Sequence, residues 1–288
     1  MDLSKHAFFE GKIVPQSEAN INIATHGFLY GTAVFGGMRG YWNEEKQRLF
    51  VFRPYDHFRR LLHSARMMAM TTSYDEESLI QLTLDVLRTD NWQRDVYMRP
   101  TFYKADLGIG VKLHDLKDEF CMFVMAYEPY VKNDTNAHAT VSSWRRIDDN
   151  VIPARGKVAG AYANSALIKT DANRSGFDEA LVLDNNGHIS EGSAMNIFMV
   201  RDGVVVTPPI TDNILEGITR RSVIELARKE LGLEVVERSI DRTEVFICEE
   251  MFMTGTAAQI IAVTKIDHRP VGAGVMGPVT SKLRSLYE

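Results

Sequence analysis

The stretch Arg155-Gly156-Lys157-Val158-Ala159-Gly160-Ala161-Tyr162 surrounds one lysine with glycine and alanine. Small neighbours leave space beside the lysine amine for a bulky planar partner. A tight apolar setting lowers the pKa of a lysine, which lets the amine act as a nucleophile and as a proton carrier. By itself a loop lysine is usually solvated and has no chemical role. The segment gains meaning only from what accompanies it.

Three later segments could complement a nucleophilic lysine in binding one planar cofactor. Glu191 ends an apolar strand, where a carboxylate can keep a pyridine nitrogen protonated. Residues 215–220 open a helix whose free N–H groups suit a phosphate, and Thr219 adds a hydroxyl. Small residues and hydroxyls follow an apolar run at 254–258. Each segment alone is ordinary, but an amine, an acid and phosphate donors together meet the needs of pyridoxal phosphate.

The bulk composition limits the class of protein. The chain has 288 residues, which suits two domains, with 45% hydrophobic and 25% charged residues. A net charge of -5 offers no basic field for nucleic acid or an anionic membrane. No apolar run approaches a membrane span or a signal peptide, so we expect a cytoplasmic location. Cys121 and Cys248 lie in apolar runs and are expected to be buried free thiols.

Periodicity in the first half predicts helices packed on an antiparallel sheet, within an α+β fold. The expected elements are a hairpin over 7–15 with Gly11-Lys12 as its turn, strands at 49–52, 96–103, 120–127 and 139–144, and helices over 54–70 and 75–89. A polar stretch at 148–150 is interpreted as the interdomain linker. This gives an N-terminal domain over residues 1–147 and a C-terminal, cofactor-binding domain over 148–288, although the N-terminal one, expected to be the smaller, has slightly more residues.

The second half predicts two hairpins and an amphipathic helix. The hairpins turn at Asn185-Asn186-Gly187 and at residues 201–203, and the helix covers 218–231 with Gly232 as its stop. Residues 272–277 match G-x-G-x-x-G, but too little chain follows them for a dinucleotide fold. We interpret them as a glycine-rich turn.

The ordered motifs KVAGAYANSAL, HISEGSAMNIF, LEGITRRSVI and MFMTGTAAQI resemble the fold-type IV pyridoxal-phosphate enzymes. In the first half HGFLYGTAVFGGMRGY, HFRRLLHSA and VYMRP are similar to the branched-chain aminotransferases. The resemblance covers nearly the whole chain. It implies transamination of leucine, isoleucine and valine with 2-oxoglutarate, in at least a homodimer. The loop from Lys104 to Lys112 is the candidate contribution to a neighbour's active site.

The resemblance also implies roles for individual residues. Lys157 matches the Schiff-base lysine, Glu191 the partner of the pyridine nitrogen, and Tyr162 the tyrosine beside the ring oxygen. The implied phosphate ligands are Arg60, Ile218, Thr219 and Thr256. The implied substrate positions are Tyr30, Phe35, Gly37, Arg39, Tyr97 and Arg99, with Thr256, Ala257 and Ala258 receiving the α-carboxylate. Tyr97 and Arg99 are two apart on a predicted strand, so they face the same side.

Alternatives remain open within and beyond the family. Within the family, the alternatives are D-amino-acid aminotransferase, (R)-amine aminotransferase and aminodeoxychorismate lyase. Outside the enzymes, the alternative is a catalytically inactive relative that only binds a partner. Gly36, Met195 and Gln259 stand where branched-chain enzymes usually carry acids. Gly36 is expected to leave space beside Phe35. A relaxed pocket that accepts (R)-primary amines is the resulting hypothesis.

Overall fold

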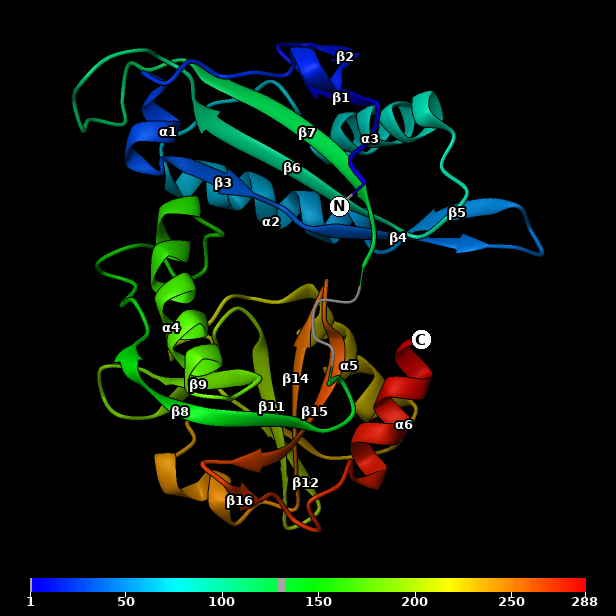
Figure 1. Cartoon of the computed structure of the whole chain (residues 1–288), viewed down its shortest axis with the longest axis vertical. Helices are drawn as coiled ribbons and strands as arrows, with labels where there is room; N and C mark the ends of the chain where they lie inside the picture. Colours follow the sequence, from blue (N-terminus) through cyan, green and yellow to red (C-terminus); the bar gives the residue numbers. More distant parts are fainter. Residues whose placement is uncertain (1, 129–132) are drawn as a thin grey trace. The chain divides into compact units, whose positions relative to one another are not determined.

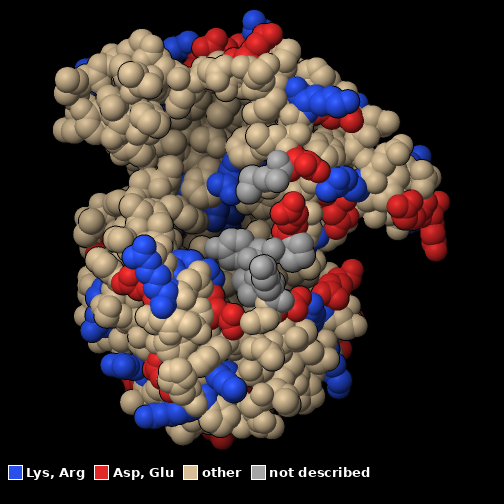
Figure 2. All heavy atoms as spheres, viewed as in Figure 1, with Lys and Arg blue, Asp and Glu red and all other residues tan. Residues whose placement is uncertain are grey.

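The protein is described by a computed structural model that covers residues 2–128 and 133–288. Helices and strands are mixed along the chain, and the chain forms two compact units. Unit 1 comprises Met1–Glu128 and Gly156–Ala161, and unit 2 comprises Pro129–Arg155 and Tyr162–Glu288. Acidic and basic side chains are interspersed over the face shown in Figure 2.

Unit 1 is built on an antiparallel sheet (Figure 1). Its strands are β1 (His6–Phe9), β2 (Lys12–Pro15), β3 (Ala33–Phe35), β4 (Met38–Asn43), β5 (Arg48–Val51), β6 (Val96–Lys104) and β7 (Asp118–Ala126). They follow the order β2-β1-β7-β6-β4-β5, and β3 pairs with β6. The long central hairpin β6–β7 carries alternating buried residues, which fixes its register.

The helices of unit 1 are α1 (His26–Tyr30), α2 (Pro54–Met67) and α3 (Glu76–Asp90), with a 3-10 turn η1 at Gln16–Glu18. Pro54 occupies the first turn of α2, where its missing N–H costs nothing. Helix α2 buries Phe58, Leu61 and Ala65. Helix α3 starts with a capping box between Asp75 and Ser78. Both helices therefore begin where local sequence signals place them.

Unit 2 contains a mixed sheet. Its strands are β8 (Ala137–Arg145), β9 (Glu179–Leu183), β10 (Ile189–Gly192), β11 (Asn196–Arg201), β12 (Val204–Thr207), β13 (Val235–Glu237), β14 (Glu250–Gly255), β15 (Gln259–Ile266) and β16 (Arg269–Pro270). The order is β10-β9-β8-β15-β14-β11-β12-β13, with β16 beside β15. Strand β8 is parallel to both β9 and β15, and β12 is parallel to β13. The other pairings are antiparallel.

The helices of unit 2 are α4 (Tyr162–Arg174), α5 (Ile218–Lys229) and α6 (Pro278–Tyr287), with a 3-10 turn η3 at Arg242–Phe246. A further 3-10 turn, η2 at Ala159–Ala161, belongs to unit 1. Helix α5 ends close to Gly232, whose φ of +62° is the left-handed conformation that stops helices. Its partner α6 packs beside it.

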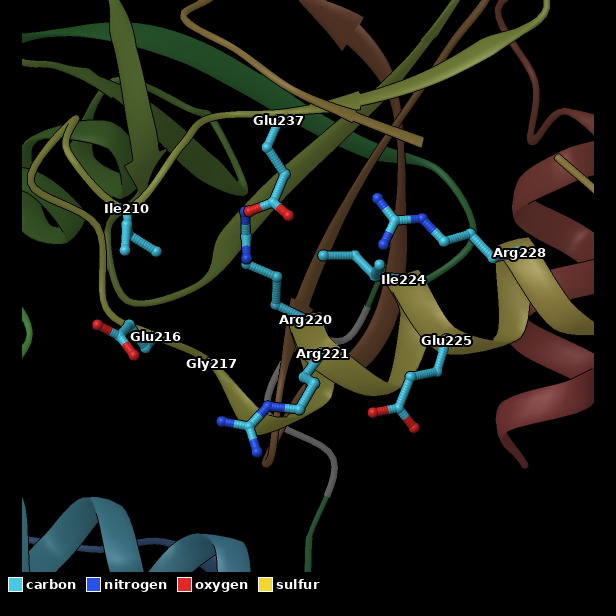
Figure 3. A pocket seen from close by; sticks show the side chains of 9 residues that line it. All are labelled: Ile210, Glu216, Gly217, Arg220, Arg221, Ile224, Glu225, Arg228 and Glu237. Carbon is cyan, nitrogen blue, oxygen red and sulfur yellow. The ribbon is translucent and has the colours of Figure 1, made fainter. Parts of the chain in front are cut away.

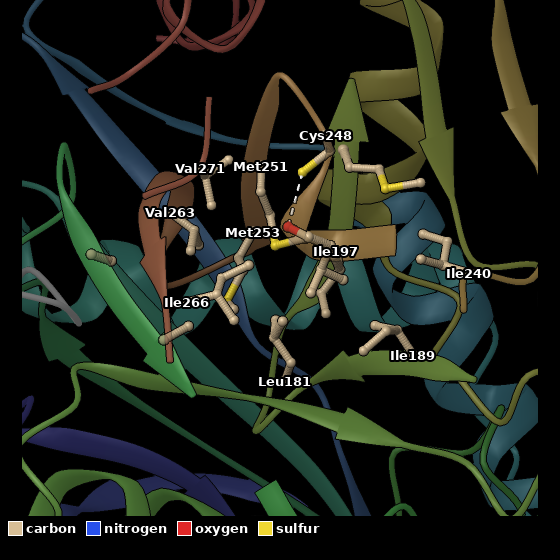
Figure 4. Close-up of a cluster of buried hydrophobic side chains, with 14 of the residues drawn as sticks. Leu181, Ile189, Ile197, Ile240, Cys248, Met251, Met253, Val263, Ile266 and Val271 are labelled. Atoms are coloured by element: carbon tan, nitrogen blue, oxygen red, sulfur yellow. Dashed lines mark hydrogen bonds between the residues drawn. The ribbon is translucent and has the colours of Figure 1, made fainter. Parts of the chain in front are cut away.

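The core of unit 2 explains its long apolar runs. On β11 and β14, Ile197 and Met253 face one buried cluster, drawn in Figure 4, which also holds Leu181 and Ile240. The alternate residues face a second cluster that α5 and α6 cover, where the rings of Phe198 and Phe252 stack. Both faces of these strands are buried, so the strands read as continuous hydrophobic segments.

Most expected elements are present, two expectations need correction, and one helix was not expected. The first hairpin turns at Glu10-Gly11, because Phe9 pairs with Lys12. Strand β8 belongs to the sheet of unit 2, so the division of the chain differs from the boundary expected at residue 147. Helix α4 was not among the expected elements.

Other expectations hold. Residues 272–275 form turns and bends, with Gly272 and Gly274 at positive φ, as expected for a glycine-rich turn. Both cysteines are free. Cys248 is buried as expected, whereas Cys121 is partly exposed. Burial of the sulfur raises the pKa of each thiol to about 12, and in Cys121 only other atoms of the residue reach the surface. None of the helices in the described part of the chain is long and apolar enough to cross a membrane.

Candidate active site

Lys157 is held in unit 1 by its main chain. Its carbonyl accepts a hydrogen bond from the N–H of Phe35 at 3.0 Å. Its own N–H donates to the Ser64 hydroxyl at 3.2 Å. The next residue, Val158, bridges to Val34 at the edge of the sheet. The Lys157 amine then lies 5.1 Å from the centroid of the Phe35 ring. Two candidate residues far apart in sequence are thus brought together.

Arg60 is connected to the same anchor. It lies on α2, one turn before Ser64, and the Ser64 hydroxyl donates to the Arg60 carbonyl at 2.9 Å. Ser64 is completely buried. One hydroxyl therefore fixes the spacing between the main chains of Arg60 and Lys157.

An aromatic and basic cluster lies on strands β3 and β6. Arg99 donates to the Tyr97 hydroxyl at 3.2 Å, and its guanidinium carbon lies 4.5 Å from the centroid of the Phe35 ring. A Cβ added at Gly37 would lie 2.0 Å from the Tyr97 hydroxyl. Only glycine allows this approach. The expected same-side placement of Tyr97 and Arg99 is observed.

Arg39 and Tyr30 lie in the same unit with different partners. Arg39 is 4% exposed, and its Nη2 donates to Asp95 at 3.0 Å. Its guanidinium carbon also lies 3.5 Å from the centroid of the Tyr127 ring. Tyr30 accepts a hydrogen bond from the N–H of Gly110 at 3.2 Å, which ties the loop after β6 to this tyrosine.

Glu191 in unit 2 is held by its carboxylate. The side chain of Arg146 lies 2.8 Å from Oε1; the Glu191 side chain is buried, and that of Arg146 is 12% exposed. Oε2 accepts from the N–H of Leu215 at 3.0 Å and from the Asn196 amide at 3.3 Å. A register shift between Ile189 and Glu191 interrupts the β9–β10 ladder. Such irregularities redirect a side chain away from the regular alternation of a strand.

The start of α5 is packed against the same group. Gly217 caps the helix, and a Cβ there would lie 2.0 Å from Oδ1 of Asn196. Asn196 also donates to the Leu215 carbonyl at 2.9 Å. Ile218 and Thr219 are buried in the first turn. The helix start and the Glu191 carboxylate thus share one asparagine.

A cavity of about 330 Å³ lies on the side of this first turn (Figure 3). Both positively charged arginine and negatively charged glutamate side chains line the cavity. Among them Arg220 points to Glu237 and pairs with it at 2.7 Å. This arginine is therefore neutralised locally and is not directed to the helix N-terminus.

The expected carboxylate turn lies between β14 and β15. Gly255 pairs with Gln259, so Thr256, Ala257 and Ala258 form the turn. Met195 is 4% exposed, and a Cβ on Gly255 would meet it at 3.4 Å. Tyr162 is the first residue of α4 in unit 2 and is partly exposed.

The expected space beside Gly36 is absent. A Cβ at this position would lie 2.8 Å from Cγ of Pro100, whose carbonyl also accepts from the Gly36 N–H at 2.7 Å. The proline ring fills the volume that glycine leaves. This expectation is wrong, because the sequence does not show which residue of β6 lies opposite.

Comparison with known proteins adds the family. The model described as amino-transferase class IV matches residues 33–266. The chain belongs to the class IV aminotransferases. A probable branched-chain-amino-acid aminotransferase of Aquifex aeolicus is 48% identical, with 98% of this chain and 90% of that protein covered. The branched-chain-amino-acid aminotransferase of Escherichia coli K12 is 36% identical over 98% of this chain and 91% of that protein.

A solved structure shares the fold. The branched-chain aminotransferase of Thermobaculum terrenum, in its PLP-form, superposes with a TM-score of 0.94 at 36% identity. The match covers 100% of this chain and 94% of that chain. The expected fold-type IV class, the aminotransferase activity and the pyridoxal-phosphate cofactor are confirmed.

The described residues of this class IV aminotransferase suit the cofactor chemically. The Lys157 amine and the Arg60 guanidinium suit an aldehyde and a phosphate, and the Glu191 carboxylate suits a pyridine nitrogen. Ser193 and Thr254 each have a buried hydroxyl with no hydrogen-bond partner among the described residues. Thr254 pairs across the ladder with Asn196, whose side-chain amide donates to the Glu191 carboxylate. Buried hydroxyls of this kind are available to a polar ligand.

Sequence reasoning missed the residues that position these groups. Ser64 reads as a routine helix residue, and Arg146 lies in a polar stretch that was interpreted as the approach to a linker. Each acts on a partner tens of residues away, and no local pattern signals such a pair. Among the residues that position Glu191, only Asn196 lies in one of the quoted motifs, HISEGSAMNIF.

Proposed function

We propose that this chain transfers the amino group of leucine, isoleucine or valine to 2-oxoglutarate. The observation that carries the proposal is the cluster in which Arg99 binds Tyr97 and lies over Phe35, with the Lys157 amine on the same ring. Its aromatic side suits a branched alkyl chain. Its basic end suits the second carboxylate of the oxo acid.

Lys157 is the proposed catalytic residue. It would bind the aldehyde of pyridoxal phosphate and, once released, carry the proton that leaves the donor's Cα. The cofactor, when bound, supplies a ring that accepts the electron pair left at that carbon. The main-chain anchors at Ser64 and Phe35 keep the lysine within reach while its side chain turns.

The other cofactor residues divide by the part of the cofactor that they would hold. Glu191 would keep the pyridine nitrogen protonated, and Tyr162 would contact the ring oxygen. The proposed phosphate ligands are Arg60, Thr256 and the first turn of α5 with Ile218 and Thr219. The positive end of a helix dipole and free N–H groups favour an anion there.

The substrate residues are proposed in the same way. Phe35 and Tyr97 would bound the alkyl chain, and Gly37 lets the Tyr97 hydroxyl approach. Thr256, Ala257 and Ala258 would receive the α-carboxylate. The remaining proposed pocket residues are Tyr30, Arg39 and Arg99.

The test is a donor panel with 2-oxoglutarate as acceptor. We expect turnover with the three branched-chain L-amino acids and little with their D-enantiomers. Arg99→Met should raise KM for 2-oxoglutarate more than KM for leucine, because only the acceptor carries a second carboxylate. Arg94→Met, at a largely exposed ion pair with Asp2, is the matched control. Activity with D-amino acids alone would overturn the assignment in favour of a D-amino-acid enzyme.

A second activity, on (R)-primary amines, is also proposed. Met195 places a buried thioether beside Gly255, next to the turn proposed for the α-carboxylate. An aryl or methyl group in place of the carboxylate is better accommodated by a less polar wall. The test is (R)-1-phenylethylamine as donor, in the wild type, Met195→Gln and the control Met195→Leu. Turnover of the amine should fall in Met195→Gln only. No turnover of the amine by the wild type would reject the proposed activity on (R)-primary amines.

We further propose a homodimer, or a larger homo-oligomer, that acts in the cytoplasm. The loop after β6 exposes Leu107, Ile109 and Val111, by 61%, 96% and 79%, while Gly110 binds Tyr30. A partner chain that covers this loop would reach a proposed pocket residue. Two free thiols agree with a reducing compartment. Sedimentation of Ile109→Lys against the wild type tests the dimer, which should dissociate at higher concentration in the variant.

A further inference from the structure

Three side chains of unit 2 form a cluster that the proposed aminotransferase activity does not use. Asp184 follows β9, His188 precedes β10, and Asp212 lies in the loop that leads to α5. Each offers one ligand atom, and these atoms lie within 4.8 Å of one another. Asp184 and Asp212 are 2% and 7% exposed, while the side chain of His188 is 35% exposed. The cluster is therefore built from buried acids with one opening to solvent.

Asp212 supplies a second, independent observation. Its Oδ2 is buried and has no hydrogen-bond partner among the described residues. The main chain of the same residue is fully used, since its carbonyl accepts from the Ser190 hydroxyl at 2.6 Å and its N–H donates to Pro209 at 3.1 Å. A buried carboxylate oxygen without a donor is costly unless a cation meets it. The loop holds this oxygen in place without satisfying it.

The Asp184 carboxylate is oriented mainly by main-chain donors and contributes one oxygen to the cluster. Its Oδ1 accepts from the N–H groups of Asn186 and His188, both at 2.9 Å. Its Oδ2 accepts a long hydrogen bond from the Asn186 side-chain amide at 3.5 Å and lies 4.0 Å from Nδ1 of His188. The nearby Arg145 donates to the Asp184 carbonyl and not to the carboxylate. The negative charge of Asp184 is thus oriented by hydrogen bonds rather than neutralised by that arginine.

The imidazole has a suitable partner on its far side. Nε2 of His188 lies 3.5 Å from Oδ1 of Asp241, which is exposed. A histidine that binds a metal through one nitrogen usually donates its other N–H to a carboxylate, which fixes the ring orientation. With Nδ1 as the ligand, Asp241 takes that place.

We propose that Asp184, His188 and Asp212 bind a divalent first-row transition-metal ion, with Zn²⁺ as the first probe. One imidazole and two carboxylates suit such an ion, and solvent through the His188 opening completes the shell. Bond lengths of about 2.1 Å hold two ligands no more than about 4.2 Å apart, so the side chains close in slightly on binding. The half-exposed His188 has room to turn.

The ion would join the β9–β10 hairpin to the loop before α5. One residue after Asp212, the Asn213 carbonyl accepts from Arg146 at 3.1 Å. Two residues further on, the N–H of Leu215 donates to Glu191. Metal binding would therefore stiffen the loop that positions the Glu191 carboxylate. The metal site itself does not depend on the role proposed for Glu191.

The experiment is calorimetric titration of Zn²⁺ into untagged, chelator-treated holoenzyme. We expect one saturable site and a rise in Tm of about 5 °C at saturation. Asp212→Asn and His188→Gln should each weaken binding at least about tenfold. His268→Gln is the matched control, because His268 lies 4.9 Å from His138 in a separate histidine pair. A parallel titration with Mg²⁺ should give no binding at the same concentrations.

Hydrogen exchange supplies a readout of the connection to Glu191. Amides in the peptide over 208–217 should exchange more slowly with Zn²⁺ in the wild type and not in Asp212→Asn. Zn²⁺ affinity that is equal in the wild type and Asp212→Asn, or lost only in His268→Gln, would overturn the site. So would the absence of binding by the folded wild type. Each result is read without measuring transamination, so failure here leaves the proposed function standing.

Discussion

Lys157 in unit 1 and Glu191 in unit 2 are held in opposite ways. Ser64 and Phe35 hold Lys157 by its main chain, on both sides of the side chain. Arg146 and the N–H of Leu215 hold Glu191 by the carboxylate itself. A main-chain anchor fixes where a side chain starts and permits its rotation, whereas a clamped carboxylate is fixed at its reacting atoms. The role proposed for Lys157, a proton carrier, needs the first arrangement, and the role proposed for Glu191, an electrostatic partner, needs the second.

Removing the mobile group should have the largest effect. Lys157→Ala should abolish turnover and the covalent link to the cofactor while the fold persists, because its neighbours hold the main chain. Borohydride reduction of the wild type, followed by peptide mapping, should label Lys157. The exposed Lys265→Ala is the control and should keep full turnover. Label on Lys169 or Lys265 would contradict the assignment.

Removing the fixed charge should cost less. Glu191→Gln keeps the shape and one hydrogen-bond acceptor but loses the charge, so kcat should fall on the order of 100-fold. Cofactor affinity should change little, because the proposed phosphate ligands at Arg60, Ile218 and Thr219 remain. Kinetics per bound cofactor and equilibrium dialysis separate the two quantities. Lost cofactor with unchanged turnover per bound cofactor would show that the role is wrong.

Replacing Arg146 tests whether its ion pair with the buried Glu191 carboxylate stabilises the fold. Arg146→Gln leaves the Glu191 carboxylate buried without its cation, which should destabilise the fold by about 3 kcal/mol. Arg155→Gln is the control, since its pairs with Asp149 and Glu216 are 3.5 and 3.4 Å long and partly exposed. The control should cost less than about 1 kcal/mol. Denaturant unfolding measures both, and equal losses would show that the buried pair has no special weight.

The smallest expected effect concerns the pocket in unit 1. Gly37→Ala should displace the Tyr97 ring and raise KM for leucine about tenfold, with the fold intact. In a Tyr97→Phe background the same substitution should cost less, because the 2.0 Å contact with the hydroxyl is gone and the nearest remaining ring atom, Cζ, is 2.8 Å from the added Cβ. Full additivity of the two substitutions would show that the 2.0 Å approach has no functional consequence.

Much of this molecule could be predicted from local signals. Periodicity predicted the helices over 54–70 and 75–89, and Asp202-Gly203, both at positive φ, form the turn of an expected hairpin. Lys157 and Glu191 were predicted as cofactor residues because the order of four motifs resembles that of one enzyme family, and these roles remain proposals. Each of these features depends on a short segment of sequence, or on motifs that resemble those of a known family, so it can be predicted from a few neighbouring residues.

The tertiary structure decided the rest. It joined β8 to the second sheet, filled the space beside Gly36 with Pro100, and brought Arg146 to Glu191 across 45 positions of sequence. It also gathered Asp184, His188 and Asp212, which no spacing in the sequence suggested. The physical reason is that a residue's hydrogen-bonding and hydrophobic tendencies are its own, whereas its partner is chosen by how the sheets pair and pack. The sequence by itself determined which groups this aminotransferase carries, and packing determined what each group faces.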